Sequence, residues 1–438
     1  MIKVMVVGGG AREDAVCRKL ARDGAKIYSV LSNLNPSILS LSTDRLIARE
    51  TESRTIVSYA EENEVDLVFV GPDPALATDL VDSLIEKGIR VASPTRKAAE
   101  IETSKAFMRE LVDKYKIPGQ VDHRVFTSTS GLPEYLAELG DYAVKPLGLT
   151  GGKGVRVKGD HFRTDSEGLD IAARIIGSDG SVLIERKIIG EEFSLQAFSD
   201  GENLSFMPVA QDYKRAFDGD MGPNTGGMGS ITDSDHGLPF ISKSAVSESK
   251  EIMLQILHAM RSEDREFRGI LYGQFMETSG GTRIIEINSR FADPEGINAL
   301  FLMDDSLLDV LFGISDGKLS EHYEFMKKAT VLKYVVPPGY GSADPEVVEL
   351  HVDPGIAGQG SEIFYASVSG TLSDIRTTRS RSLAVISAAE SIPEAAEITD
   401  SVVNRIRGRF HYRKDIGTRE SLDQKIRRME SIRSASPP

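Results

Sequence analysis

Short apolar runs alternate with helical patterns through the first hundred residues of the chain. Each run is rich in β-branched residues and is predicted to be a strand, while helical spacing, as in residues 11–23, fills the segments between them. The predicted strands cover residues 3–7, 26–31, 66–70 and 89–92. Strands separated by helices form parallel βαβ units with right-handed crossovers. Residues 1–100 are therefore predicted to fold as an open parallel-sheet domain.

The loops after these strands lie at the carboxyl edge of the predicted sheet, where open α/β sheets bind ligands. The first loop, residues 8–10, is three glycines, but Glu13 stands at the third glycine position of a dinucleotide fingerprint, and no acidic residue follows the second strand. This pattern favours a loop for a phosphate or small ligand over a nicotinamide site, since N–H groups at a helix N-terminus suit an anion. A tight turn that leads into a helix is the alternative, and it explains the glycines by itself.

Beyond residue 100 the pattern changes. A helix at residues 103–115 precedes a stretch of strands and turns at 121–155, and a long irregular loop is expected at 212–232. The other elements expected here are strands at residues 182–188, 192–198, 270–277 and 282–288 and a helix at 244–261. From about residue 325, short strands and Gly/Pro turns predict a separate small α+β unit.

Composition narrows the class of protein. A chain of 438 residues suggests about three domains. Lys plus Arg is 52 and Asp plus Glu is 66, so the net charge of −14 argues against nucleic acid as a partner. The single cysteine, Cys17, excludes an internal disulfide framework and a cysteine-based zinc site. No apolar run approaches 18 residues and the start lacks a signal-peptide core, so we expect no membrane span and a cytoplasmic location.

A second glycine-rich stretch, residues 148–155, follows a predicted strand that carries Lys145. Its glycine spacing, and the lack of Ser or Thr after Lys153, exclude a Walker A loop. Two lysines that flank a flexible turn place positive charge over a triphosphate while bare backbone approaches it. An ordinary hairpin with solvated lysines is the alternative.

Residues 183–188 are predicted to form a strand whose edge groups suit an adenine. Glu192 follows this strand after a glycine turn, and its carboxylate suits the hydroxyls of a ribose. A surface hairpin with charged edges is the alternative for this segment taken alone.

The long loop at residues 212–232 is a third candidate for ligand binding, because long irregular loops are uncommon in compact domains and are often functional. Lys214 and Arg215 suit an acidic substrate, and Asp212 suits an amine.

The strongest local pattern is the apolar strand that contains Glu286 and Asn288. Residues i and i+2 of a strand share one face, so the two side chains are predicted to project together. Two oxygen ligands from one strand suit Mg²⁺, which keeps waters and takes its remaining ligands from nucleotide phosphates. Gln274 on the neighbouring strand is a third candidate ligand, and Arg290 suits a phosphate or carboxylate. The alternative is an ordinary carboxylate on an edge strand.

The order of these motifs resembles that of the ATP-grasp carboxylate–amine ligases. A lysine in a helix (Lys105), a lysine on a strand (Lys145), a glycine-rich hairpin, an adenine strand and a Glu-x-Asn metal strand follow one another. Over its full length the chain resembles the phosphoribosylamine–glycine ligase family of purine biosynthesis. The resemblance rests most on residues 211–229, 286–295 and 410–417.

The sequence departs from the family pattern at several positions. Asp14 stands where a histidine usually follows the first glycines, and Asp73 replaces a glutamate. The other departures are Pro146-Leu147, Arg186-Lys187 and Ala292. They affect the expected substrate contacts and leave the expected phosphate and metal groups intact.

The resemblance implies an α/β protein of three parts. These are an N-terminal open-sheet domain at 1–100, an ATP-grasp α+β body at 101–325 with a small lid at about 121–190, and a C-terminal α+β cap at 326–430. The implied reaction begins when ATP phosphorylates the carboxylate of glycine. The amine of 5-phosphoribosylamine then attacks this glycyl phosphate, which gives glycinamide ribonucleotide, ADP and phosphate.

The resemblance also implies four groups of site residues. The expected catalytic side chains are Arg290, Asp212, Lys214 and Asp293. ATP is expected on Lys105, Lys145, Gly151, Gly152, Lys153, Gly154, Glu185, Ile188 and Glu192. The substrates are expected on Gly9, Gly10, Arg12, Gly71, Pro72, Asp73, Asn224, Thr225 and Gly226. A Mg²⁺ or Mn²⁺ ion is expected on Glu286, Asn288 and Gln274.

Two other functions remain open from the sequence. One is a different ATP-grasp ligase, which shares the nucleotide site and differs in the first domain and in residues 211–229. The other is a non-catalytic nucleotide-binding regulator, although a sensor need not keep a complete metal site. We expect small-molecule partners only, no nucleic acid or membrane, and a monomer.

Overall fold

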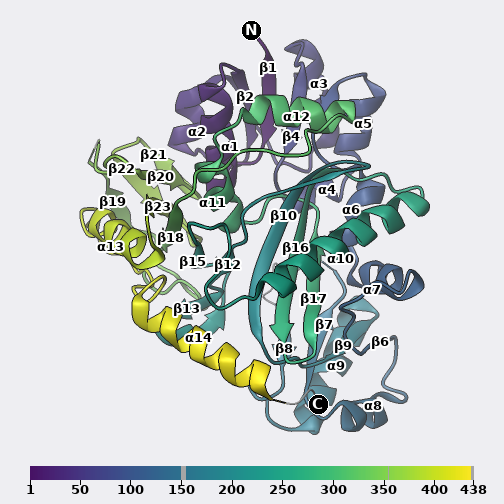
Figure 1. Cartoon of the computed structure of the whole chain (residues 1–438). Helices are drawn as coiled ribbons and strands as arrows, with labels where there is room; N and C mark the ends of the chain where they lie inside the picture. Colours follow the sequence, from purple (N-terminus) through teal and green to yellow (C-terminus); the bar gives the residue numbers. More distant parts are fainter. Residues whose placement is uncertain (149–153, 354, 436–438) are drawn as a thin grey trace.

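The computed structural model describes residues 1–148, 154–353 and 355–435 (Figure 1). Gly151, Gly152 and Lys153 of the predicted nucleotide loop lie outside the described residues. Within the described ranges, no helix is long and apolar enough to cross a membrane.

The N-terminal part is a five-stranded sheet in the order β3-β2-β1-β4-β5, with every neighbouring pair parallel. Its strands are β1 (Lys3–Val7), β2 (Lys26–Leu31), β3 (Ser42–Ile47), β4 (Leu67–Val70) and β5 (Arg90–Val91). Its helices are α1 (Ala11–Arg22), α2 (Pro36–Leu41), α3 (Ser53–Glu62), α4 (Asp73–Leu76), α5 (Leu80–Glu86) and α6 (Arg96–Thr103). The predicted parallel sheet is confirmed, but the edge strand β3 was missed because most of its side chains are polar or exposed.

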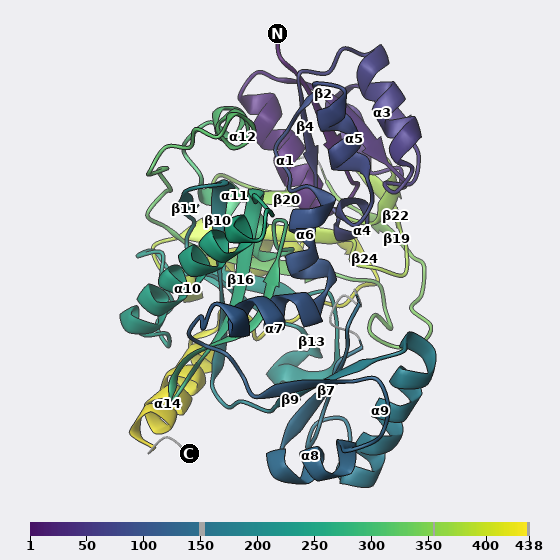
Figure 2. The same ribbon diagram turned by 90° about the vertical axis from the view of Figure 1, so that its right-hand side faces the viewer.

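A small subdomain, residues 121–190, holds a four-stranded sheet in the order β6-β9-β7-β8, and it lies at the lower end of the molecule in Figure 2. Its elements are β6 (His123–Phe126), α8 (Leu132–Leu139), β7 (Tyr142–Pro146), β8 (Arg156–Val157), α9 (Asp165–Asp179) and β9 (Val182–Arg186). The prediction of strands and turns alone at 121–155 was wrong, because α8 lies there. This helix buries Leu132, Leu136 and Leu139 at helical spacing, and Gly131 precedes it with a φ of 74° that suits glycine.

The central body is an antiparallel sheet in the order β11-β10-β16-β17. Its strands are β10 (Glu191–Asp200), β11 (Leu204–Phe206), β16 (Arg268–Thr278) and β17 (Gly281–Asn288). The helices of the body are α7 (Lys105–Lys114), α10 (Lys243–Ser262), α11 (Glu295–Leu302) and α12 (Leu307–Asp316).

A second five-stranded sheet, in the order β12-β15-β18-β23-β20, combines short strands from 211–232 with the C-terminal part. Its strands are β12 (Gln211–Asp212), β15 (Gly229–Thr232), β18 (Ala329–Val335), β20 (Ser361–Tyr365) and β23 (Leu383–Ala389). Between β12 and β15 lies a hairpin of β13 (Arg215–Phe217) and β14 (Met221–Asn224) around a short 3-10 turn. The prediction of an irregular loop at 212–232 was therefore wrong, and strand pairing between β15 and β18 crosses the predicted boundary at 325.

The remaining C-terminal elements complete the cap. They are β19 (Glu349–His351), β21 (Val368–Gly370), β22 (Asp374–Thr377), β24 (Arg407–Gly408), α13 (Ile392–Val403) and α14 (Arg419–Ser434). Helix α14 runs back along the central body in Figure 1, and Arg433 near its end pairs with Glu277 of β16 at 2.8 Å.

Packing brings the end of β17 against the N-terminal sheet. Phe291, just after β17, contacts Phe69 of β4 and Phe198 of β10, with ring centroids 5.9 and 6.1 Å away. All three rings belong to one buried cluster that extends through the N-terminal, central and C-terminal parts. The predicted metal strand and the N-terminal loops therefore meet at one place.

Candidate active site

The predicted metal ligands lie on two paired strands of the central sheet. Gln274 of β16 is directly opposite Glu286 of β17. Asn288 donates a hydrogen bond from Nδ2 to Glu286 Oε1 at 3.1 Å, which confirms that these two side chains project together. Gln274 donates from Nε2 to Glu192 Oε2 at 2.5 Å, while its buried Oε1 has no hydrogen-bond partner among the described residues.

Glu286 and Lys214, both partly buried, each favour the charged form of the other. Burial alone would raise the pKa of the Glu286 carboxyl, but Lys214 above all, with Asn288 and Arg290, holds it below its usual value. Burial likewise opposes the charge of Lys214, but Glu192 and Glu286 raise its pKa. Lys214 Nζ lies 3.2 Å from Glu192 Oε2. The predicted ribose carboxylate, the catalytic lysine and the metal carboxylate are therefore neighbours.

The two predicted phosphate lysines lie at the start of the glycine-rich stretch. Lys105 is the first residue of α7, which Ser104 caps, and its Nζ donates to the carbonyl of Gly148 at 2.8 Å. Burial lowers the pKa of Lys105, and the nearby Lys145 lowers it further. An anion between the two ammonium groups relieves this repulsion.

Glu185 contributes to the site by holding Lys145. Its carboxylate forms ion pairs with Lys145 and with Arg109 Nε, the latter at 2.8 Å. Burial would raise the pKa of Glu185, but Arg109 and Lys145 lower it to about 2. Arg109, which the sequence did not single out, is fully buried and also donates to the carbonyls of Ile284 and Ile285. The carboxylate of Glu185 is thus held by cations of the protein, and Glu192 is the carboxylate next to the predicted metal ligands.

Arg290 links the predicted metal strand to the N-terminal part. Its Nη2 lies 3.0 Å from Glu102 Oε1, and its buried Nε has no partner within the part of the chain that the structure describes. Glu102 also accepts hydrogen bonds from the backbone N–H and hydroxyl of Ser289, each at 2.8 Å. Burial opposes the charge of Arg290, but Glu102 and then Asp73 raise its pKa, so the predicted acceptor loop at Asp73 is close to this guanidinium.

The first glycine loop is hydrogen-bonded to the carboxylate of Glu13, which follows it in the chain. Glu13 accepts a hydrogen bond from the N–H of Gly10 at 2.8 Å and another from Arg12 Nε at 2.7 Å. A Cβ at Gly71 would collide with the same carboxylate. Arg12 also donates to the carbonyl of Phe291 at 2.9 Å. The predicted substrate residues of both loops therefore border the end of β17, although Glu13 already binds the groups that suit an anion.

Asp14, where the sequence departs from the family pattern, ties the N-terminal part to the C-terminal cap. Its buried carboxylate accepts hydrogen bonds from Arg18 at 3.1 Å, from Ser37 Oγ at 2.5 Å and from the backbone N–H of Tyr365 at 2.8 Å. The departure therefore lies at a contact between two parts of the protein.

Arg381 connects the second acceptor segment to Asp293. Its Nη2 lies 3.0 Å from Asp293 Oδ2, and its Nη1 donates to the carbonyls of Gly226, Gly227 and Asp293. Tyr334 donates its hydroxyl hydrogen to the other oxygen of Asp293. Neither Arg381 nor Tyr334 was found from the sequence, because they lie far along the chain in segments without a recognisable motif.

Asp212 lies next to the same glycine segment. A Cβ at Gly227, whose φ is 104°, would come within 2.7 Å of Asp212 Oδ1 and 2.6 Å of Pro294 Cδ, so glycine permits this close approach. Burial and the nearby Glu295 raise the pKa of Asp212 well above its usual value. Its Oδ1 has no hydrogen-bond partner among the residues described.

The donor set fits a hard divalent cation. The described residues contain no group of three or more His, Cys, Asp or Glu side chains that could hold a metal ion. The site instead offers the carboxylate of Glu286 and the amide oxygens of Asn288 and Gln274, and the last of these is buried without a partner in the described part of the chain. Mg²⁺ and Mn²⁺ accept such oxygen ligands and take others from water and phosphate.

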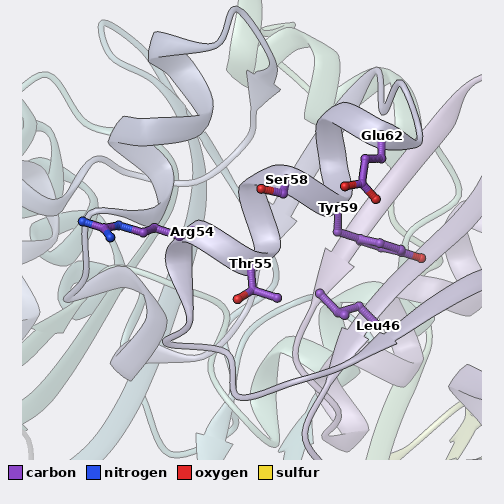
Figure 3. A pocket seen from close by; sticks show the side chains of 6 residues that line it. All are labelled: Leu46, Arg54, Thr55, Ser58, Tyr59 and Glu62. Carbon is purple, nitrogen blue, oxygen red and sulfur yellow. The ribbon is translucent and has the colours of Figure 1, made fainter.

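A separate depression of about 420 Å³ lies between β3 and α3 in the N-terminal part (Figure 3). Leu46, Arg54, Thr55, Ser58, Tyr59 and Glu62 line it. It is open to solvent, and Arg54 extends away from Tyr59 in the picture. It shares no residue with the site at the end of β17.

Comparison with known proteins agrees with this geometry. Residues 2–102 match the N domain of phosphoribosylglycinamide synthetase, and residues 103–296 match the ATP-grasp (A) domain of the same enzyme. The chain belongs to the phosphoribosylglycinamide synthetase family. It is 44% identical to the phosphoribosylamine–glycine ligase of Methanothermobacter thermautotrophicus, over 99% of this chain and 100% of that protein.

Solved structures of similar fold include one from the same family. The crystal structure of the phosphoribosylamine–glycine ligase of Thermotoga maritima matches with a TM-score of 0.80 at 25% identity, over 95% of this chain and 100% of that one. The biotin carboxylase domain of the Hydrogenobacter thermophilus 2-oxoglutarate carboxylase, solved with MgADP and bicarbonate, matches with a TM-score of 0.72. It is 16% identical over 98% of this chain and 93% of that one, and this likeness shows the fold alone.

Proposed function

We propose that this member of the family uses ATP to ligate glycine to 5-phosphoribosylamine through a glycyl phosphate. The observation that carries the proposal is the convergence of four predicted groups at the end of β17. Glu286 and Asn288 are hydrogen-bonded there, Lys214 pairs with Glu192, and Arg290 adjoins the N-terminal loops. Family membership supplies the identity of the substrates.

ATP is proposed to lie between the small subdomain and β17. Lys105 and Lys145 are proposed to hold its α and β phosphates, with Glu192 on the ribose and Ile188 near the adenine. Glu185 positions Lys145 in this arrangement. Gly151, Gly152, Lys153 and Gly154 are proposed to cover the phosphates and exclude water, because an acyl phosphate would otherwise hydrolyse.

A divalent cation, Mg²⁺ or Mn²⁺, is proposed to bind Glu286, Asn288 and Gln274. When bound, it supplies positive charge next to the phosphates. The lowered pKa of Glu286 keeps this ligand ionised, and the free Oε1 of Gln274 suits a cation.

In the first step, a carboxylate oxygen of glycine attacks the γ-phosphorus of ATP, the bond to the β,γ-bridging oxygen breaks, and ADP leaves. Arg290 and Lys214 are proposed to neutralise the transferring phosphoryl group. The protein contributes positioning and charge to such a transfer and does little covalent work.

In the second step, the amine nitrogen of 5-phosphoribosylamine attacks the carbonyl carbon of glycyl phosphate. A C–N bond forms, the C–O bond to the phosphoryl group breaks, and phosphate leaves. The nitrogen must lose a proton, and Asp212 is proposed to accept it, because its raised pKa makes the carboxylate a stronger base. Asp293, held by Arg381 and Tyr334, is proposed to fix the loop beside it.

The acceptor is proposed to lie between three loops. These carry Gly9, Gly10 and Arg12, then Gly71, Pro72 and Asp73, and finally Asn224, Thr225 and Gly226. The nearness of Asp73 to Arg290 and the hydrogen bond from Arg12 to Phe291 support this placement.

The test is ADP release by the purified protein with ATP, Mg²⁺ and 5-phosphoribosylamine, with and without glycine. We expect multiple-turnover ADP release only when glycine and the amine are both present. Ribose 5-phosphate, which lacks the amine, is the matched control acceptor and should give no glycinamide ribonucleotide. ADP release that does not depend on glycine would exclude this ligase and favour another ATP-grasp activity, and ATP binding without turnover would favour a regulator.

We also propose that the metal is Mg²⁺ or Mn²⁺, that the protein is a monomer and that it is located in the cytoplasm. Parallel titrations with the two metals, sedimentation and cell fractionation test these three proposals in turn.

A further inference from the structure

The C-terminal motif at residues 411–415 contacts the β13–β14 hairpin through several hydrogen bonds, and this set of contacts is called the grip below. His411 Nε2 bonds to the carbonyl of Ala216 at 3.0 Å, with its ring edge-on to Phe217. The backbone N–H of Lys414 donates to Asp218 Oδ1 at 2.9 Å, and Asp415 accepts a hydrogen bond from the N–H of Gly219 at 3.0 Å. Contacts from one short segment thus reach both the first strand of the hairpin and its turn.

Arg413 is the centre of this grip. It is 1% exposed, and its guanidinium contacts Asp415 through Nε at 2.9 Å and Nη2 at 2.5 Å. Its Nη1 donates to Asp220 Oδ1 at 2.7 Å and to the carbonyl of Arg215 at 3.2 Å. The guanidinium carbon lies 5.0 Å from the centre of the Tyr213 ring. Asp415 and the hairpin are therefore held by one rigid fork of donors.

The gripped hairpin carries residues of the proposed site at both ends. Lys214 directly precedes β13, and Thr225 directly follows β14. The N–H and hydroxyl of Thr225 donate to the carbonyl of Lys214 at 2.8 and 2.9 Å, so the backbones of the two residues are tied together. Toward the small subdomain, Arg215 Nη2 approaches Asp160 Oδ2 at 3.9 Å. The hairpin therefore joins the lysine that faces Glu286 to the segment proposed for the acceptor.

We propose that Arg413 is a positioning residue, which holds the β13–β14 hairpin so that Lys214 and Thr225 present correct geometry to the reacting groups. The expected change in kinetics rests on the proposed function. The hold of Arg413 on the hairpin rests only on the contacts given above. Arg413 contacts Asp415, Asp220, the carbonyl of Arg215 and the ring of Tyr213, and none of these residues is proposed to hold ATP. Its loss should therefore affect chemistry and acceptor binding more than nucleotide binding.

The test compares Arg413→Lys, which keeps the charge and loses the fork, with the wild-type chain. We expect kcat to fall by roughly 10- to 100-fold and the KM for 5-phosphoribosylamine to rise, since small misplacements of reacting groups cost about this much. The Kd for a non-hydrolysable ATP analogue should stay within about twofold. A kcat and KM close to wild type in Arg413→Lys would overturn the proposal.

Two control variants separate positioning from general damage. Arg409→Ala, four residues before Arg413, removes an exposed pair with Glu346 and should leave the kinetics unchanged. Arg433→Ala, on α14, removes a partly buried pair with Glu277 of β16, and it should lower thermal stability without the same split between kcat and nucleotide binding. If Arg433→Ala reproduces the split, the effect is general and the proposal fails.

Hydrogen exchange provides a readout that does not need turnover. The backbone amides of Tyr213, Thr225 and Met228 are hydrogen-bonded within this segment and should exchange faster in Arg413→Lys and in the milder Asp415→Asn. Unchanged exchange in both variants would overturn the grip even if activity falls. If the wild-type chain shows no glycine-dependent activity, the proposed function fails, and the exchange result still decides the role of Arg413.

Discussion

Two buried polar regions of this protein differ in how their hydrogen bonds are satisfied. In the first glycine loop, Glu13 accepts from Gly10 and Arg12, and Arg12 finds its other partner in the carbonyl of Phe291. At the end of β17, Gln274 Oε1 and Arg290 Nε are buried without partners among the described residues. Both regions are rich in the residue types that bind anions or cations.

The difference separates groups that build the fold from groups that are prepared for a ligand. Buried polar atoms in folded proteins are almost always hydrogen-bonded, so a buried atom without a partner requires a separate explanation. The end of β17 concentrates such atoms between ionised Glu286, Lys214 and Arg290, where phosphates and a cation are proposed to bind. The first glycine loop is instead closed by its own carboxylate.

The largest effect is expected at the end of β17. Glu286→Ala and Arg290→Ala should each reduce glycine-dependent turnover by roughly 100-fold or more, the scale for one lost charge contact to the transition state. ADP release under saturating substrates measures this. Arg283→Ala, on the same strand with a hydrogen bond to Thr282 beside it, is the control. Near-normal activity of both site variants would contradict the assignment of this region as the active site.

A smaller kinetic effect is expected where Arg381 joins the glycine segment to Asp293. Arg381→Lys keeps the charge but cannot reach all three carbonyls and the carboxylate, so kcat should fall by about 10-fold. Arg379→Ala, which removes an exposed pair with Asp344, should behave as wild type. Equal kinetics for the two variants would show that the link between Gly226 and Asp293 has no role in turnover.

The buried ion pairs of Glu185 predict how the free energy of unfolding depends on pH. Its pKa is lowered from 4.5 to about 2 in the folded protein, so it contributes stability that is present above about pH 4.5 and is lost as the pH falls toward 2. The contribution is roughly 3 kcal/mol. Glu185→Gln removes the ion pairs with Arg109 and Lys145 and should be less stable at pH 7, with a flatter change between pH 4.5 and 2. Urea unfolding at a series of pH values measures both slopes, and parallel slopes would contradict the prediction.

The smallest functional effect is expected from Asp14, in the region where polar groups are mutually satisfied. Asp14→Asn weakens its hydrogen bonds to Arg18, Ser37 and Tyr365 and should lower the free energy of unfolding by about 1–3 kcal/mol. Its kcat should stay within about twofold of wild type. Glu61→Gln, which removes an exposed pair with Lys87, should cost less than about 1 kcal/mol. A large kinetic loss in Asp14→Asn would place this residue in the substrate site.

Regular patterns account for what was predicted well. The four apolar runs of the first domain became strands of a parallel sheet, and the two-residue spacing of Glu286 and Asn288 placed both on one face of β17. Helix α8 and strand β3 were missed, one inside a stretch expected to form strands and the other on a mostly exposed edge. Residues 212–232 were expected to be irregular, but they form short strands. A two-residue strand such as β12 has no recognisable sequence pattern, because it is defined by its pairing with β15.

The sequence by itself determined the parallel N-terminal sheet, the strand that carries the proposed metal ligands and the resemblance to a ligase family, since periodicity and motif spacing are local properties. Only the tertiary structure decided that Arg381, Glu102 and Arg413 contact residues in and around the proposed site, because each meets partners more than a hundred residues away in the chain. The tertiary structure also decided which polar groups are already satisfied. A carboxylate such as Glu13 and one such as Glu286 look alike in sequence, and their difference lies in the neighbours that folding brings to them.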